Sequence, residues 1–464
     1  MTLIRLLPLL GAGLLGACGV LQPPAPPPAP APTQWQAAWP SSSETAAAPS
    51  MATWWQRFDD PHLVALQAQA RARSPELAQV AARLAQARAQ ADAAGALRGP
   101  QVAAVASGQR GQALPGFQLS STAQGQLQAA WELDLFGRQR AQTAAALAQR
   151  EAAAAALAGA QVSLSAEVAQ AYLAYRHAQQ LARLADADEA AALRQQAAAQ
   201  AAAGAGLLSP AQANEVALGV AGVRIDAAAL RQRADLLLQT LAVLVADEAG
   251  PLQQRLGEAP PRLAPAFAAP RGLPTQLLAQ RPDLVAAREQ WVASVMAWRG
   301  AEAARWPQLQ WGALIGEGRL ELGGGTSSGR VWSVFPTLSW PLFDGGLRQA
   351  QASSAQAQEA EARAALEARW RVAVAEVEQS LLEVTRTESQ FATMQAAMGQ
   401  AQRLDASAAQ QAAAGLISGT ERAAVQRQFI AAQRQAHELA LARSAAWISL
   451  YRRLGGGWSP EQES

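Results

Sequence analysis

Two copies of one pattern make up most of this 464-residue chain, and the duplication constrains its fold more than any other feature. In each copy, apolar and polar residues alternate up to a Leu-Phe pair, after which a glycine-bearing turn leads into a very long segment of Ala, Gln, Arg and Glu. Alternation indicates a β-strand, and the uninterrupted segment indicates a helix. Each apolar position of the first strand has a counterpart 207 positions later: Leu127, Ala129, Trp131, Leu133 and Leu135 correspond to Val334, Pro336, Leu338, Trp340 and Leu342.

The duplication extends on both sides of these strands. Residues 74–77 correspond to 281–284 at the same spacing of 207, and Gly206 corresponds to Gly415 at 209, because the turn after Phe343 is two residues longer. A repeated order of this kind predicts two equivalent halves. Each half should contain a helix, a β-hairpin, a long helix, a turn and a second long helix.

The hairpins are predicted at about 101–136 and about 308–343, with glycines 323–325 at the tip of the second. Each strand has one apolar and one polar face, which is the pattern of transmembrane β-strands of about 9 to 11 residues. A soluble sheet would show the same alternation. The flanking helices are too long to cover such a sheet, so the pattern favours strands in a membrane.

The long helices are predicted at about 138–203 and about 347–414, with return helices at about 209–246 and about 418–454. At 1.5 Å per residue, each long helix would measure on the order of 100 Å. Helices of globular proteins average about 11 to 12 residues. These four segments are therefore typical of a coiled-coil or tubular array.

Each long helix ends at a tight reversal. Gly206 and Gly415 can adopt the left-handed conformation that ends a helix. Ser209 can then cap the first return helix, while Ser418 and Glu421 form a capping box at the start of the second.

Composition narrows the function classes. Aromatic residues are 5% of the chain, the net charge is +2, and no basic cluster suggests a nucleic-acid partner. His62, His177 and His437 lack the spacing of a metal site, and each is predicted to be an ordinary helix-surface residue. We find no Ser/His/Asp spacing and no phosphate-binding glycine loop in the sequence, so we expect neither catalytic residues nor a metal, and an enzyme is disfavoured.

The N-terminal region has the form of an export signal over 1–17, an apolar run too short to span a bilayer. It ends in Leu15-Gly16-Ala17-Cys18, which resembles a bacterial lipobox. Cys18 would then be lipidated and become the mature N-terminus, because a lone cysteine has no disulfide partner within the chain. The alternative is an ordinary signal cleaved nearby. A Pro-rich tether over 18–53 follows.

The rest of the chain divides by its repeats. Repeat 1 is predicted over 54–246 and repeat 2 over 274–458. The crossing segment at 247–273 is rich in proline and is predicted to be irregular. A short tail follows at 459–464.

Four membrane strands cannot close a barrel, since closed barrels have at least about eight strands and lipid does not tolerate open sheet edges. Other copies of the chain must complete the wall. Two, three or four copies would supply 8, 12 or 16 strands, and the residues alone do not decide between them.

Several motifs in their order resemble the TolC-like outer-membrane efflux factor family, in its lipoprotein (NodT-type) branch. The resemblance implies an α+β membrane protein: a homotrimer whose 12-stranded transmembrane β-barrel, with four strands per protomer, continues into a periplasmic α-helical coiled-coil barrel with a mixed equatorial region. The motifs are the lipobox at Cys18, the Trp54-Trp55 entry, Arg281-Pro282-Asp283-Leu284, the two strand-to-helix junctions, the paired Gly-Leu-x-Ser turns and the closing Leu454-Gly-Gly-Gly-Trp458.

The resemblance also implies an activity and partners. The protein would be a lipid-anchored, passive outer-membrane duct that exports small molecules or drugs, with no cofactor beyond the lipid on Cys18. It would work with a periplasmic adaptor and an inner-membrane pump, commonly of the resistance-nodulation-division type, and contact outer-membrane lipid. Two alternatives stay open: a type I secretion duct for peptides or proteins, and a periplasmic coiled-coil scaffold lipoprotein without a pore.

The same resemblance places functional residues at the helix reversals. The tips that would contact the adaptor are Gly206, Leu207, Ser209, Gly415, Leu416 and Ser418. The family often has aspartates just after the second turn, where they ring the closed aperture, but this chain has Ala424 there. Glu421 and Arg422, one turn away, are the remaining gate candidates, unless Glu421 acts only as a cap and Arg422 is solvated.

Overall fold

The computed structural model describes residues 25, 32–37, 51–112, 119–257, 278–322, 324–456 and 458. The predicted signal, Cys18, most of the tether and the tail lie outside the described residues. The chain forms two compact units. The described residues of the first lie in Met1–Ala29, Ala81–Ala155 and Val285–Arg369, and those of the second lie in Pro30–Val80, Ala156–Leu284 and Trp370–Ser464.

The two halves share a helix, two strands, a long helix and a return helix in the same order, which confirms the predicted fold class, and the first half has three further helical elements among the described residues. Both long helices have 67 residues and both return helices have 35, as a duplication requires. The first half comprises the 3₁₀-helix η2 (Met51–Phe58), α2 (Pro61–Arg73), α3 (Pro75–Ala96), β1 (Gln101–Gly111), β2 (Ser120–Leu133), α4 (Arg138–Gly204), α5 (Pro210–Leu244) and α6 (Ala249–Leu256). The second comprises α8 (Pro282–Ala303), β3 (Gln308–Leu322), β4 (Gly325–Ser339), α9 (Leu347–Ala413) and α10 (Gly419–Arg453).

The prediction of an irregular crossing segment is wrong for α6. Pro251 stands in the first turn of this helix, where a proline removes no helical hydrogen bond. Leu252 and Leu256 are buried, and their burial stabilises the helix. Residues 258–273, the rest of the predicted crossing segment, lie outside the described part of the chain.

An aspartate links each strand to the long helix that follows it. Asp134 accepts hydrogen bonds from the backbone N–H groups of Gln139 and Arg140, at 3.1 and 2.8 Å. In the second half, Asp344 accepts from the backbone N–H of Arg348 at 3.2 Å. These carboxylates satisfy donors that a helix N-terminus leaves unpaired, and they lie at the positive end of the helix dipole. The two equivalent junctions therefore begin with the same cap.

Alanine lets the long helices pack closely. In the first unit, α4 buries alanines at intervals of three and four residues: Ala141, Ala145, Ala148, Ala152 and Ala155. Among the described helices, only α4 is long and apolar enough in composition to cross a membrane, with a mean hydropathy of 1.3 over the relevant window. This hydropathy comes mainly from alanine, which suits contact between helices as well as contact with lipid.

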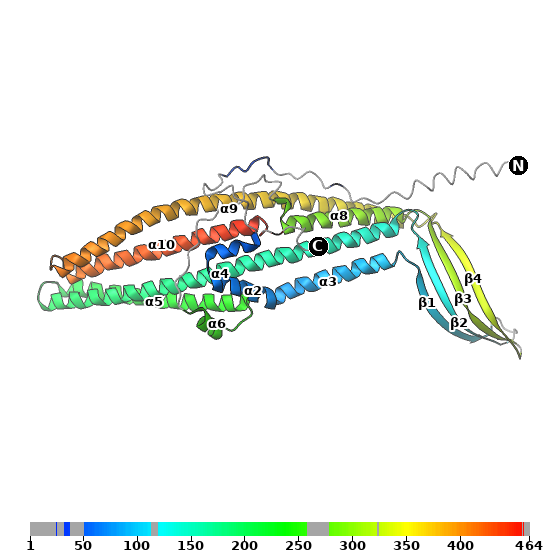
Figure 1. Cartoon of the computed structure of the whole chain (residues 1–464), viewed down its shortest axis with the longest axis horizontal. Helices are drawn as coiled ribbons and strands as arrows, with labels where there is room; N and C mark the ends of the chain where they lie inside the picture. Colours follow the sequence, from blue (N-terminus) through cyan, green and yellow to red (C-terminus); the bar gives the residue numbers. More distant parts are fainter. Residues whose placement is uncertain are drawn as a thin grey trace. The chain divides into compact units, whose positions relative to one another are not determined.

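The largest hydrophobic core lies in the second unit. Trp54 of η2 stacks on Tyr451 of α10 with ring centroids 4.7 Å apart, and Trp55 contacts the same ring edge-on. Arg281 is buried beside this core and pairs with Asp283 at 2.9 Å and with Glu376 at 2.7 Å. Figure 1 shows α5 returning along α4 and α10 returning along α9.

A short stretch of the tether is fixed to α9. Consecutive backbone N–H groups of Gln36 and Ala37 donate to the two carboxylate oxygens of Glu378, at 2.7 and 2.8 Å. Trp35 packs against the core of the second unit. Hydrogen bonds to an ionised acceptor are stronger than neutral ones. Glu378 therefore holds this stretch of the tether on the folded body.

We predict that Glu378→Ala releases this stretch. Loss of two charge-assisted hydrogen bonds should lower the protection of the Gln36 and Ala37 amides from hydrogen exchange by about tenfold. The matched control is Glu383→Ala, which removes the Arg386 partner on an exposed face of the same helix. Unchanged protection in Glu378→Ala, or an equal loss in the control, would contradict the role of Glu378.

Two histidines meet between α4 and α10. The rings of His177 and His437 lie 6.3 Å apart, and the Nδ1 atom of each is buried without a hydrogen-bond partner. His177 is only 5% exposed, so its prediction as a helix-surface residue is wrong. Burial lowers the pKa of His177 to about 4, and positive charge on His437 and Arg233 contributes in the same direction. The folded protein therefore favours the neutral imidazole.

This burial predicts a loss of stability in acid. The unfolded chain binds a proton at His177 as the pH falls below about 6.5, whereas the folded chain does so only near pH 4. Stability should be complete above about pH 6.5 and fall between there and pH 4. Melting temperatures of the detergent-solubilised protein across this range test it: His177→Gln should flatten the dependence relative to wild type. His62→Gln, on α2, is the control, and an equal slope in wild type and His177→Gln would refute the assignment.

Candidate functional site

The four strands form a single antiparallel sheet in the order β1-β2-β3-β4 (Figure 1). The central pair joins the two halves of the chain, because β2 pairs with β3 from Ser120 opposite Leu322 to Leu133 opposite Leu309. β1 and β4 each pair with one neighbour within the chain. Both outer edges therefore carry backbone groups with no partner strand in this protomer.

The register places apolar side chains on one face in successive rows. Directly paired residues of an antiparallel sheet lie on the same face. This face, called the outward face below, is made by the rows Leu127-Ile315-Trp332, Ala129-Ala313-Val334, Trp131-Trp311-Pro336 and Leu133-Leu309-Leu338. Many of its large side chains are exposed in the protomer, including Trp332 at 72%.

The opposite face is mainly polar and rich in glutamine. It carries Gln124, Gln126, Gln128, Glu132, Gln310 and Thr337. Phe335 also lies there, over Gly312, where an added Cβ would come within 2.3 Å of its ring. One apolar and one polar face are the arrangement of a wall between lipid and water.

The apolar rows continue to the end of the strands where the helices follow. Within β4 they extend from Trp332 to Leu338, which at about 3.3 Å per residue is roughly 20 Å along the strand. Trp340 and Leu342 lie beyond Ser339, the last residue of β4, and are 57% and 81% exposed, so they continue the apolar surface outside the strand. An outward apolar band is the lipid-facing feature of outer-membrane barrels.

The predicted tip residues lie at two equivalent turns. Gly206 and Gly415 adopt φ angles of +73° and +72°. Each turn closes with two backbone hydrogen bonds of a helix C-terminal motif, such as the one from the Leu207 N–H to the Ala202 carbonyl at 2.8 Å. Leu207 and Leu416, at the apex, are 82% and 74% exposed. Two apolar side chains are thus held out into solvent by glycine geometry.

Serine caps the helix after each turn. Ser209 accepts from the Gln212 N–H, and Ser418 accepts from the Glu421 N–H at 3.1 Å. The Ser418 N–H donates to Glu421 Oε2 at 2.8 Å, and this hydrogen bond is the first cause that lowers the pKa of Glu421. The predicted capping box is confirmed. The Glu421 carboxylate is therefore already engaged at the helix start.

Arg422 is not freely solvated. Its Nη1 lies 2.6 Å from Asp405 Oδ1, and the two side chains are 23% and 22% exposed. This ion pair joins α10 to α9 within one helical hairpin. Ala424, at the position where an acidic residue was sought, is exposed.

A second ion pair was not predicted. Arg427 of α10 lies 2.8 Å from Asp188 of α4, so it joins the two helical hairpins. In contrast, Arg231 and Asp186, 2.6 Å apart, join α5 to α4 within the first hairpin. No signal in the sequence marks Arg427, because arginines and acids recur along all four long helices. Within the described residues no three metal-ligating side chains gather.

Comparison with known proteins agrees with this geometry. The model of the outer membrane efflux protein family matches residues 66–246 and 273–456. The pyoverdine export outer membrane protein OpmQ of Pseudomonas aeruginosa is 30% identical over 467 residues, covering 97% of this chain and 96% of that protein. The outer membrane protein OprJ of the same species is 32% identical over 345 residues, covering 71% of this chain and 68% of that protein.

Solved structures show the same fold. The outer-membrane channel OprN superposes with a TM-score of 0.81 at 27% identity, covering 94% of this chain and all of that one (100%). CusC superposes with a TM-score of 0.78 at 22% identity, covering 94% and 100%. The chain belongs to the outer membrane efflux protein family, and its sheet and long helices are those of an outer-membrane efflux channel with a large periplasmic portion.

Proposed function

We propose that three copies of this chain form one passive duct, in which their sheets close a 12-stranded barrel and their long helices form a periplasmic tube. The observation that carries the proposal is a four-stranded sheet with one continuous apolar face, whose two outer strands pair with no further strand among the described residues. In lipid, the edges of one protomer must pair with those of another. With three copies, six similar units would surround the bore with near-sixfold symmetry, because each chain is a duplication.

The cargo is proposed to be small molecules, delivered by an inner-membrane pump of the resistance-nodulation-division type through a periplasmic adaptor. Relatives with named cargo or partners include a pyoverdine exporter and components of toluene and solvent efflux pumps. The exposed Leu207 and Leu416 at the helix tips are the contacts offered to the adaptor. Apolar side chains on rigid turns can dock without ordering a loop.

We propose that opening of the duct separates the α4/α5 hairpin from the α9/α10 hairpin at the periplasmic end. The Arg422–Asp405 pair lies inside the α9/α10 hairpin, so it can persist when that hairpin moves as a unit. The Arg427–Asp188 pair joins α10 to α4 and must break. Arg427 is therefore a better gate candidate than Arg422 or Glu421.

Planar-bilayer recordings test both the duct and its gate. Wild-type protein should conduct ions with mostly closed channels, and Arg427→Ala should raise the open fraction by at least about fivefold, because a partly buried ion pair contributes roughly 1 kcal/mol to the closed state. Arg422→Ala should have a smaller effect. Arg386→Ala, which removes an exposed pair within α9, is the control. A protein that inserts no channel at all would refute the duct, while equal open fractions in all variants would refute only the gate.

We also propose that Cys18 carries the N-terminal lipid. Its support is the position of the only cysteine after an apolar export signal and small residues. Radiolabelled palmitate should remain on wild-type protein and be absent from Cys18→Ser. Equal labelling of both proteins would exclude lipidation at this position.

A further inference from the structure

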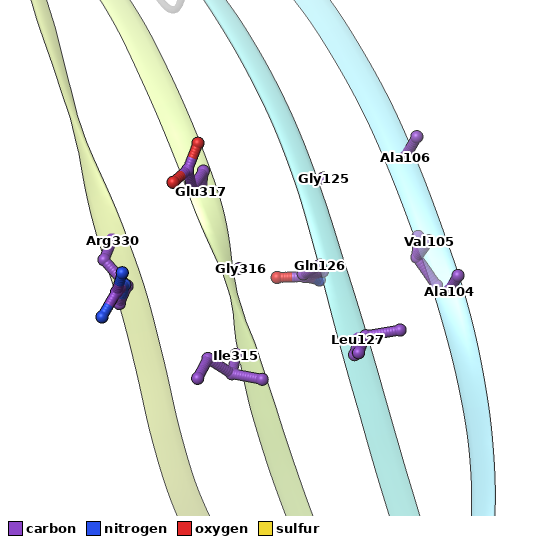
Figure 2. Close-up of a pocket in the computed structure, with 10 residues that line it drawn as sticks. All are labelled: Ala104, Val105, Ala106, Gly125, Gln126, Leu127, Ile315, Gly316, Glu317 and Arg330. Atoms are coloured by element: carbon purple, nitrogen blue, oxygen red, sulfur yellow. The ribbon is translucent and has the colours of Figure 1, made fainter.

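Three adjoining depressions run along the outward face of the sheet, and we call them together the outward groove. Its lower part is apolar, lined by Leu127, Ala129, Ala313, Ile315, Trp332 and Val334. Its upper part carries the charged residues Glu317, Arg319 and Arg330. The middle part shares Leu127 and Ile315 with the lower part, and Glu317 and Arg330 with the upper part. Figure 2 shows the middle part, where Leu127 and Ile315 lie toward one end and Glu317 toward the other. The groove is thus apolar at one end and charged at the other.

The floor of the charged end is made by small residues. On the outward face, β1 contributes Ala106 and Gly108 there, and β2 contributes Ala123 and Gly125. β3 and β4 provide the longer side chains beside them. A shallow shelf therefore lies next to a wall of charged residues, within one protomer.

The charged end carries two arginines, Arg319 and Arg330, which have acidic neighbours on the same face but form no ion pair with them. Arg330 stands opposite Glu317 in the register, and Arg319 lies two residues from Glu317 on the same face. Among the ion pairs found in the described part of the chain, none involves Arg319 or Arg330. Both residues are exposed. Two exposed guanidinium groups therefore lie within reach of an anion, beside the carboxylates of Glu317 and Glu321 on the same face.

The position of these arginines in the membrane follows from the chain's path. The long helices α4 and α9 follow the C-terminal ends of β2 and β4, at Leu133 and Ser339. The charged end of the groove lies at the opposite end of these strands, so it lies away from the periplasm. It begins one row beyond Ile315 and Trp332, the last row of the apolar band. We expect a charged side chain in that row to lie at the level of the outer-leaflet headgroups, because charge is excluded from the hydrocarbon region.

We propose that the outward groove binds one phosphate-bearing lipid of the outer leaflet, with an acyl chain along the apolar end and a phosphate at Arg319 and Arg330. The apolar rows exclude water from the chain, and paired guanidinium groups bind phosphate oxygens with favourable geometry. Apolar and cationic parts lie in the order in which such a lipid presents its own groups. A free anion would use only the upper part of the groove.

Binding measurements on the purified full-length protein in detergent test the proposal. The ligands are bis-phosphorylated lipid A, phosphatidylcholine and inorganic phosphate, and binding is followed by native mass spectrometry and by melting temperature. Lipid A should bind more tightly than phosphatidylcholine. Arg319→Gln combined with Arg330→Gln should weaken lipid A at least about tenfold, which is ~1.4 kcal/mol, and leave phosphatidylcholine unchanged. The matched control is Arg110→Gln, on the same face but outside the groove lining, and it should change little.

A second variant tests the shelf. Ala123→Trp fills its floor and keeps both arginines, so it should reduce binding of lipid A while the ion conductance of the duct persists. Equal affinity for lipid A and phosphatidylcholine, or an unchanged lipid A affinity in either groove variant, would overturn the proposal. So would stabilisation by inorganic phosphate as large as that by lipid A.

Discussion

Unpaired backbone groups at a sheet edge are costly in hydrocarbon, and this cost governs the rest of the structure. The sheet of one protomer ends at β1 and β4, and its outward face is too apolar to lie in water. One protomer therefore forms only part of a closed wall in the membrane. The apolar face can contact lipid and the polar face can line a water-filled bore only when the sheet edges are joined to those of other copies.

The strand-to-helix junctions connect this wall to the periplasmic portion. Asp134 and Asp344 cap the first turns of α4 and α9, so each strand leads directly into a helix of 67 residues. Alanine at the buried positions lets such helices pack at close distance without a thick core of large side chains. The larger apolar and aromatic residues are instead concentrated around Trp54 and Tyr451, where the elements entering and leaving the body meet.

The ion pairs between helices stabilise two different kinds of contact. Arg422 and Asp405 stabilise a hairpin, whereas Arg427 and Asp188 stabilise the contact between hairpins. The His177 and His437 contact also lies between α4 and α10, and it adds apolar packing only while both rings are neutral. The interface between the two hairpins thus combines a few polar contacts with the small apolar cluster of Leu184, Ala191 and Ile430.

Local pattern determined the repeats, the four strands and their faces, the long helices, and the glycine turns with their serine caps, because each depends on residues a few positions apart. Periodicity also showed that one chain could not close a barrel. Tertiary structure decided the contacts between distant residues, such as Arg427 with Asp188 and His177 with His437. Many arginines occupy similar helix positions, and nothing near the three histidines in the sequence shows that two of them come together. Burial of Leu252 and Leu256 also stabilises α6 within a proline-rich segment. The pairing of the strands places Arg319 and Arg330 beside a shelf of small residues from other strands. These features depend on register and packing, which single-sequence periodicity does not contain.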